Sequence, residues 1–240
     1  MANWGDTLKK VAPRLPTEGI KHTHYDGGRQ SEHITGLNLR SKKIAIGLPM
    51  DEVIFSQFLV NYLGLDMMPW DSMISTTSTY LPEARNKIHN SFLKSATDCD
   101  HLFMLDSDVM PPPKTIEMLL SHGKDLVGGW YRKKEKYPLK TENGVQIIQR
   151  PVVYDNAGIR DGIIQYTQKI VPGTGLEEVA AAGAGCWLMS RKLAEALGEN
   201  PYSMENGGED MNLCRQTTKL GFSMWVDWSI ACAHIGTFFV

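Results

Sequence analysis

Between residues 42 and 131 the sequence alternates short apolar runs with stretches of helical periodicity, and this alternation constrains the fold more than any other feature. Strands are predicted at "KKIAIGLPM" (42–50), within "DSMISTTSTY" (71–80), over 101–106 and at "DLVGGWY" (125–131). A helix is predicted after each of the first three. Such alternation predicts an α/β fold in which helices cover both faces of a mostly parallel central sheet. Ligands then bind beyond the carboxyl ends of the strands.

The three predicted helices have start and end signals of their own. Asp51 is placed to cap a helix over 52–65, and Pro82 occupies a first-turn position of the second helix. Pro113 opens the third helix, and Gly123 is expected to end it. The inner face of the second helix is predicted to contain Ala84, Ile88, Phe92 and Ala96.

Length and composition indicate one globular domain with an N-terminal extension. At 240 residues with 42% hydrophobic content, the chain can bury a sizeable core. Residues 1–41 have no sustained hydrophobic period, so the expected division is an extension over 1–41 and a domain over 42–240. The net charge of −2, with acids and bases interspersed, gives no global field that would attract nucleic acid or an anionic membrane.

The sequence also predicts a cytoplasmic location. No apolar stretch is long enough to span a bilayer, and the polar start "MANWGDTLKK" lacks the apolar core of a signal peptide. The four cysteines lie far apart without a Cys-x-x-Cys pair, which indicates neither a zinc site nor a disulfide framework. We expect them to be reduced and mostly buried.

In the stretch "HLFMLDSDVMPPP" (101–113), an apolar run ends in two carboxylates one residue apart. In an extended chain Asp106 and Asp108 would point to the same face and repel each other unless a cation or a shared proton lay between them. A hard divalent cation is one solution, and a solvated turn without a ligand is the alternative. The similar "DCD" at 98–100 precedes the strand, so it is expected in a solvated connection away from the ligand edge.

Two glycine-containing stretches in the second half are candidate parts of the same site. In "EVAAAGAGCWLMSRKLAEAL" (178–197), Gly183 and Gly185 are predicted to form a pocket floor, with Trp187 as a platform for a sugar ring. Tight packing of a helix on the sheet explains these glycines equally well. In "NGGEDMNLCRQTTKLGF" (206–222), Glu209 and Asp210 occupy the first turn of a predicted helix, where one acid is explained by capping and a pair favours a functional role. The inner face of that helix is expected to contain Leu213, Cys214, Thr217 and Leu220.

Four features in order resemble the nucleotide-sugar-dependent glycosyltransferases of the GT-A fold, particularly those of family 2. They are "GLP" after the first strand, "EARN" opening a helix, "FMLDSDVMPPP", and "GGEDMNLCRQTTKLGF" followed by "IACAHIG". The resemblance runs from about Lys42 to His234 and implies a Rossmann-like domain that transfers a sugar from a nucleotide-diphosphate sugar to an acceptor hydroxyl. Family 2 members have an acidic "DDGSxD" stretch where this chain has "ISTTSTY", so the resemblance does not imply which nucleotide the donor contains.

The resemblance also implies roles for single residues. Asp106 and Asp108 would bind a divalent metal, Mn²⁺ or Mg²⁺, that bridges the donor diphosphate, and His234 would be a third ligand. Asp210 would be the base that deprotonates the acceptor in an inverting displacement, with Glu209 orienting the acceptor or acting in its place. The residues implied on the nucleotide side are Pro49, beside the nucleobase, and Arg85 and Asn86. The acceptor, which is a glycan, a lipid, a protein or a modified nucleic-acid base, and the oligomeric state do not follow from the sequence.

Two other functions remain open at this point. Haloacid-dehalogenase-type phosphatases also have an apolar strand that ends in Asp-x-Asp, but their pattern has Thr or Val where Met110 stands and normally lies on the first strand. A non-catalytic nucleotide-sugar or carbohydrate-binding module of the same fold is the second alternative. The acids at every expected position count against it. The basic stretch "WYRKKEKYP" (130–138) is expected to be a solvated lid, or else to contact phosphates of a nucleic-acid acceptor.

Overall fold

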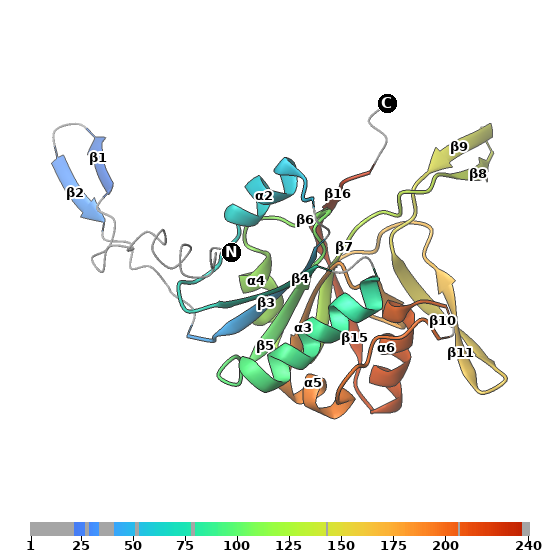
Figure 1. Ribbon diagram of the computed structural model, residues 1–240. Helices are drawn as coiled ribbons and strands as arrows, with labels where there is room; N and C mark the ends of the chain where they lie inside the picture. The colour runs from blue at the N-terminus through green and yellow to red at the C-terminus, as the bar shows by residue number, and fades with distance from the viewer. Residues whose placement is uncertain are drawn as a thin grey trace. The chain divides into compact units, whose positions relative to one another are not determined.

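Figure 1 shows a computed structural model of the chain, which describes residues 22–26, 29–33, 41–50, 53–77, 80–142, 144–205 and 207–236. The chain divides into two compact units, residues 1–40 and 41–240. In the first unit, β1 (His22–Asp26) and β2 (Arg29–His33) form an antiparallel hairpin. The sequence predicts only an irregular extension here, because the residues of this segment are mostly polar and have no hydrophobic period.

A seven-stranded sheet with the order β12-β15-β7-β14-β5-β3-β4 forms the centre of the second unit. Parallel pairing joins β4 to β3, β3 to β5 and β7 to β15, whereas β14 and β12 run antiparallel to their neighbours. Five of the seven strands therefore share one direction, as the predicted α/β fold requires. The strands are β3 (Ile44–Met50), β4 (Ser72–Thr77), β5 (His101–Leu105), β7 (Leu126–Trp130), β12 (Leu176–Val179), β14 (Cys186–Ser190) and β15 (Met224–Ala231).

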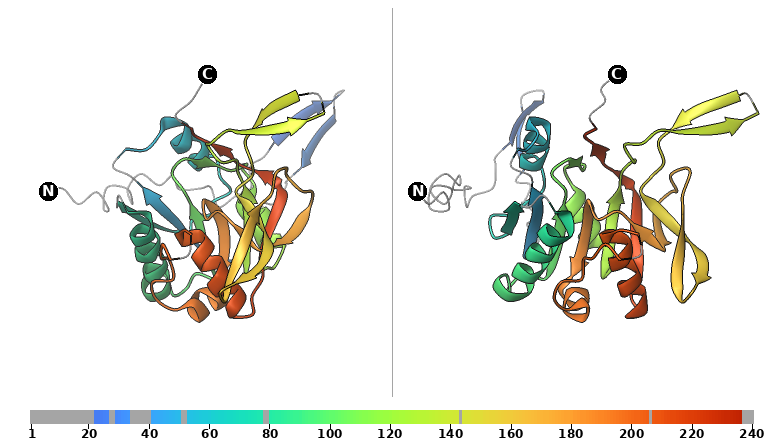
Figure 2. Two further views of the ribbon diagram at one scale, coloured as in Figure 1. Left: turned by 90° about the vertical axis from the view of Figure 1, so that its right-hand side faces the viewer. Right: turned by 45° about the vertical axis from the view of Figure 1, so that its right-hand side comes forward.

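Helices cover both faces of this sheet (Figures 1 and 2). One face carries α3 (Leu81–Ser95), α5 (Arg191–Leu197) and α6 (Glu209–Lys219), and the other carries α2 (Ser56–Leu63) and α4 (Thr115–Ser121). Successive residues of β3 point to opposite layers: Ala45 packs in one buried cluster with Ile88 of α3, and Ile44 packs in the other with Phe58 of α2 and Ile116 of α4. The predicted fold class is confirmed.

The remaining strands lie outside the central sheet. They are β10 (Val153–Arg160), β11 (Ile163–Gln168) and β13 (Ala181–Ala182) in a three-stranded sheet, the hairpin of β8 (Tyr137–Thr141) and β9 (Gly144–Ile148), and the pair of β6 (Val109–Met110) with β16 (Ala233–His234). The last pair matters for the site, because it holds His234 opposite Val109, the residue that follows Asp108.

The buried face predicted for α3 is confirmed, since Ala84, Ile88, Phe92 and Ala96 are all buried. All four cysteines are free and buried, as expected. Among the described helices, none is long and apolar enough to cross a membrane.

Two predictions about the helices are wrong, one for a helix start and one for an inner-face residue. α2 begins at Ser56 with Phe55 as its N-cap, so it does not start after Asp51, a residue that lies outside the described ranges. Val53 is 81% exposed, and the buried side chain of α2 is Phe58, so no packed face extends this helix toward its predicted start. Leu220 is 45% exposed, because it is the C-cap that follows the last turn of α6 and does not belong to its inner face.

Candidate active site

The acidic side chains singled out in the sequence gather at one edge of the central sheet. β5 ends directly before Asp106, and α6 begins at this edge with Glu209 and Asp210 in its first turn. β14 runs opposite to β5 and therefore starts at the same edge, directly after Gly185. By contrast, the second Asp-x-Asp pair lies before β5, where Asp98 is 64% exposed and pairs with Lys43. The expected separation of the two look-alike motifs is confirmed.

Arg85 of α3 joins two of the carboxylates. Its Nη2 donates to both oxygens of Asp106, at 2.8 Å each, and its Nη1 donates to Glu209. The Arg85 side chain is only 2% exposed, and its two partners lie 21 and 124 positions away in the chain. Burial would lower the pKa of Arg85, but the charges of Asp106 and Glu209 outweigh it and hold that pKa above its usual range.

The carboxyl group of Asp210, in the first turn of α6, has a raised pKa. Burial is the main cause that raises its pKa to about 6; the neighbouring charge of Glu209 adds to this, and Arg85 opposes it. Its Oδ1 accepts a hydrogen bond from the backbone N–H of Met211 at 2.7 Å. Gly207 and Gly208 precede the helix with φ of 108° and 119°, a backbone region that other residues rarely adopt. These glycines let the chain turn sharply into α6, which begins with both acids.

Asp108 faces a different set of partners. Lys134 Nζ lies 2.6 Å from Asp108 Oδ2, and His234 Nε2 lies 3.4 Å from the same oxygen. His234 Nδ1 lies 2.8 Å from the carbonyl oxygen of Arg132. Since a carbonyl only accepts, Nδ1 carries a hydrogen, and Nε2 is the ring nitrogen that faces Asp108. Burial would raise the pKa of Asp108, but His234 and Lys134 outweigh it and lower that pKa to about 2.

The two aspartates do not share one face, so that prediction is wrong. The chain leaves the extended conformation after β5 and turns, with the N–H of Val109 donating to the carbonyl of Asp106 at 3.1 Å. The turn points Asp106 at Arg85 and Asp108 at Lys134 and His234. The alternation rule for strands no longer holds at these positions.

The residues around Asp108 fit a divalent metal with few protein ligands. Asp108 Oδ2 and His234 Nε2 converge, and the carbonyl of Arg132 fixes the histidine ring, as carbonyls commonly do for metal-binding histidines. Both oxygens of Asp106 already accept from Arg85. Within the described ranges no group of three or more His, Cys, Asp or Glu could hold a metal ion. A metal here would therefore take its other ligands from substrate and water.

The two predicted floor glycines pack against protein side chains. A Cβ on Gly183 would lie 2.3 Å from the hydroxyl of Tyr131, and one on Gly185 would lie 2.9 Å from both that hydroxyl and Asp106 Oδ2. The N–H of Gly185 donates to the Tyr131 hydroxyl at 3.1 Å. These glycines therefore allow Tyr131 and Asp106 to approach the start of β14. Sequence reasoning missed Tyr131, because nothing in "WYRKK" distinguishes a buried tyrosine from an exposed one.

Trp187 does not have the predicted role, and Asn86 bonds to the protein backbone. Trp187 is 0% exposed, and its ring lies in the core. In the sheet it is paired with Met104 of β5 on one side and Gly128 of β7 on the other. It therefore cannot be a platform for a sugar ring. The side-chain amide of Asn86 donates to the carbonyl of Tyr202 at 2.8 Å and accepts from its N–H at 2.9 Å. Asn86 thus holds the segment before α6, and both polar atoms of its side chain bond to the backbone of Tyr202.

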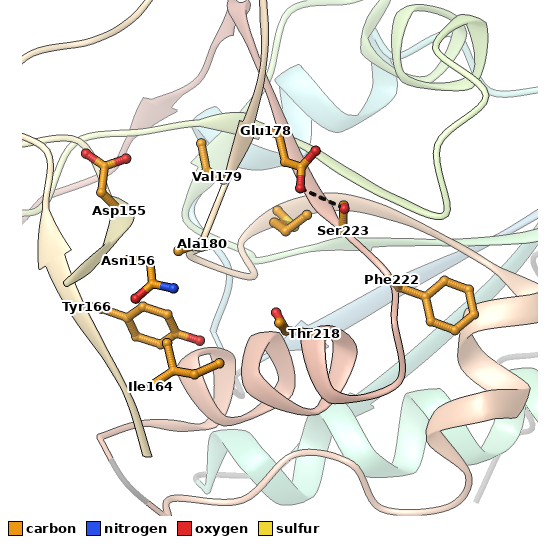
Figure 3. Close-up of a pocket in the computed structure, with 11 residues that line it drawn as sticks. Asp155, Asn156, Ile164, Tyr166, Glu178, Val179, Ala180, Thr218, Phe222 and Ser223 are labelled. Atoms are coloured by element: carbon orange, nitrogen blue, oxygen red, sulfur yellow. Dashed lines mark hydrogen bonds between the residues drawn. The ribbon is translucent and has the colours of Figure 1, made fainter. Parts of the chain in front are cut away.

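A separate cavity lies between the β10–β11 hairpin, β12 and the C-terminal end of α6 (Figure 3). Its volume is about 420 Å³. Asp155 and Glu178 lie at its rim, and none of the described residues that line it is basic. Lys169 pairs with Asp155 at 2.8 Å but does not line the cavity, so the lining offers a phosphate no basic side chain. A phosphate-bearing ligand therefore fits the edge with Lys134 better than this cavity.

No protein-family model and no curated protein matches this sequence, but solved structures match the fold. A197 from STIV superposes with a TM-score of 0.52 at 20% sequence identity, over 81% of this chain and 85% of that chain. GalNAc-T7, in a crystal structure with UDP, GalNAc and Mn²⁺, superposes with a TM-score of 0.54 at 10% identity, over 81% of this chain and 43% of that chain. At such identities the similarity shows the fold, which is GT-A-like.

Proposed function

We propose that this protein transfers a sugar from a nucleotide-diphosphate sugar to an acceptor hydroxyl in a metal-dependent, inverting reaction. The observation that carries the proposal is the grouping of Asp108 and His234 with the partly buried pair Glu209 and Asp210 at one sheet edge. The GT-A-like fold supports it, because GalNAc-T7 with UDP, GalNAc and Mn²⁺ has the same fold. The edge is also where open α/β sheets bind ligands.

In this proposal Asp108 and His234 hold the metal, Mn²⁺ or Mg²⁺. When bound, the metal neutralises negative charge on the departing nucleoside diphosphate. Asp106 faces the donor while Arg85 fixes its carboxylate, so Arg85 acts as a positioning residue and not as a direct nucleotide contact. Pro49, buried near the carboxyl end of β3, lies on the nucleobase side.

Asp210 is the proposed base. Its pKa of about 6 lies close to neutral pH, so the group is ionised at pH 7 and still basic enough to take a proton from an attacking hydroxyl. Glu209 is held by Arg85, which makes it the orienting partner. The two residues differ by one position and have different tasks because Arg85 neutralises only one of them directly.

The geometry disfavours the phosphatase alternative. A phosphatase of that type needs a free carboxylate on the first aspartate as its nucleophile, whereas Arg85 engages both oxygens of Asp106. A binding module of the same fold does not need a carboxyl group with a pKa tuned toward neutrality. Both observations favour the transferase.

Binding of a nucleoside diphosphate should depend on a divalent metal. We expect UDP or GDP to bind in the presence of Mn²⁺ and to bind at least about tenfold more weakly after chelation, because the diphosphate charge then lacks its counter-ion. Isothermal titration calorimetry with both nucleotides measures this. Asp108→Asn should bind like the chelated parent, and Asp100→Asn, in the exposed look-alike motif, should bind like the parent with Mn²⁺. Equal affinities with and without chelator would overturn the metal assignment.

A further inference from the structure

Lys134 lies where a metal ion bound to Asp108 would place its positive charge. Its Nζ is 2.6 Å from Asp108 Oδ2, the same oxygen that lies 3.4 Å from His234 Nε2. Lys134 is 43% exposed, Asp108 29% and His234 17%, so the ammonium can leave to solvent while the two candidate ligands are more enclosed. The Lys134 ammonium therefore reaches the candidate metal site from the side that is open to solvent.

The backbone that carries Lys134 is anchored on both sides. Residues 131–136 and 149–152, the stem of the β8–β9 hairpin, are joined by hydrogen bonds from the N–H of Lys133 to the carbonyl of Arg150 and from the N–H of Val152 to the carbonyl of Tyr131, both at 2.9 Å. The side chain of Gln149 donates to the carbonyl of Lys134 at 3.1 Å. The stem can therefore stay in place while the long Lys134 side chain changes partner.

A divalent cation and an ammonium cannot both occupy the space next to Asp108 Oδ2 and His234 Nε2 without strong repulsion. A metal that enters has to displace the amine, which costs the contact between Lys134 and Asp108. A diphosphate would give the displaced amine a new partner, because a lysine ammonium pairs well with phosphate oxygens. The two ligands then help each other to bind.

We propose that Lys134 is the residue that links metal binding to diphosphate binding, by neutralising Asp108 in the metal-free protein and pairing with the donor diphosphate once metal has displaced it. The proposal rests on the proposed function, and it adds to it a specific coupling: metal alone binds weakly, and metal with diphosphate binds strongly. By linkage, the factor by which metal strengthens diphosphate binding equals the factor by which diphosphate strengthens metal binding.

The test compares the parent with Lys134→Met in two titrations. Mn²⁺ alone, followed by the loss of the free-ion electron paramagnetic resonance signal, should bind about three- to tenfold more tightly to the variant, because the competing cation is gone. UDP and GDP at saturating Mn²⁺, followed by calorimetry, should bind about tenfold more weakly, because the amine no longer reaches the diphosphate. Lys134→Arg keeps the charge and should stay close to the parent with Mn²⁺ alone. Lys136→Met, exposed in the same stem, is the matched control and should change neither titration.

Opposite shifts in the two titrations support the proposal, because a misfolded stem would weaken both. Equal Mn²⁺ affinity of the parent and Lys134→Met would overturn the proposed role of Lys134 and leave the proposed function intact. A Lys134→Met variant that binds both Mn²⁺ and nucleotide more weakly would do the same. If Mn²⁺ binds neither protein, even with nucleotide, the metal site of the proposed function is wrong, and the coupling falls with it.

Discussion

Replacing Asp210 by Asn should reduce glycosyl transfer by about 10²- to 10⁴-fold and leave donor binding within about twofold of the parent. The proposed base acts on the acceptor proton in the transition state, so its loss affects the rate far more than the bound ground state. Single-turnover rates and calorimetry with the donor measure the two effects separately. Glu83→Gln is the matched control, because Glu83 is also an acid in the first turn of a helix but is 53% exposed and pairs with Lys87.

The raised pKa of Asp210 also predicts how the reaction rate of the parent depends on pH. In the parent, the rate should fall as the pH drops below about 6, where the base becomes protonated.

A carboxyl group whose pKa is higher in the folded state than in the unfolded state stabilises the fold at low pH, and this contribution is lost as the pH rises through about 6. Asp210→Asn should therefore be more stable than the parent at pH 7.5, by up to about 3 kcal/mol, and no more stable near pH 4. Urea unfolding at both pH values checks this.

Two results would contradict the role of Asp210. Loss of donor binding in the variant would place the residue in the metal or donor site. A variant with the activity of the parent, or a parent rate that does not change between pH 5 and 7.5, would mean that another group accepts the proton.

Replacing Arg85 by Met should lower the free energy of unfolding by about 3 to 5 kcal/mol at pH 7.5. The change leaves the carboxylates of Asp106 and Glu209, whose side chains are only 18% and 12% exposed, without their shared partner, and uncompensated charges with so little solvent are costly. Because Arg85 also lowers the pKa of Asp210, that pKa should rise further in the variant. Urea unfolding gives the stability, and the loss should shrink at low pH as the carboxylates become protonated.

Arg85→Lys and Lys87→Met make this prediction specific. Arg85→Lys keeps one charge but cannot contact both carboxylates with a planar fork, so it should lose part of the stability. Lys87 lies on the same helix with 54% of its side chain exposed, and Lys87→Met should change the stability by less than about 1 kcal/mol. An Arg85→Met protein as stable as the parent would show that the buried network does not contribute to the fold.

The sequence alone predicts the architecture well where a strand is buried on both faces or a helix has one buried face. β3, β5 and β7 are apolar runs in the core, and α3 buries the predicted face, so their periodicity is visible in the residues. The sequence also predicts which Asp-x-Asp pair lies at the ligand edge, because only the pair that follows β5 lies at the carboxyl end of that strand. The strands β8 to β11 were not predicted, since most of their residues are exposed or only partly buried and show no core-facing alternation.

The contacts within the site could not be predicted, because they depend on long-range packing and on local turns. The different orientations of Asp106 and Asp108 follow from a turn, which the residue types allow but do not distinguish from a continued strand. The buried position of Trp187 depends on which neighbours β14 has in the sheet. Lys134 reaches Asp108 only because the stem of the β8–β9 hairpin passes the end of β5, 26 residues away in the chain.

Release of nucleoside diphosphate from a nucleotide sugar, with water as the acceptor, tests the central claim most directly because it needs no knowledge of the natural acceptor. The parent, Asp108→Asn and Asp100→Asn are incubated with a panel of UDP-, GDP- and dTDP-sugars, each with Mn²⁺ and with chelator. We expect slow release from at least one donor that requires Mn²⁺, is lost in Asp108→Asn and is retained in Asp100→Asn. No release from any donor, or release that neither chelation nor Asp108→Asn reduces, would contradict it.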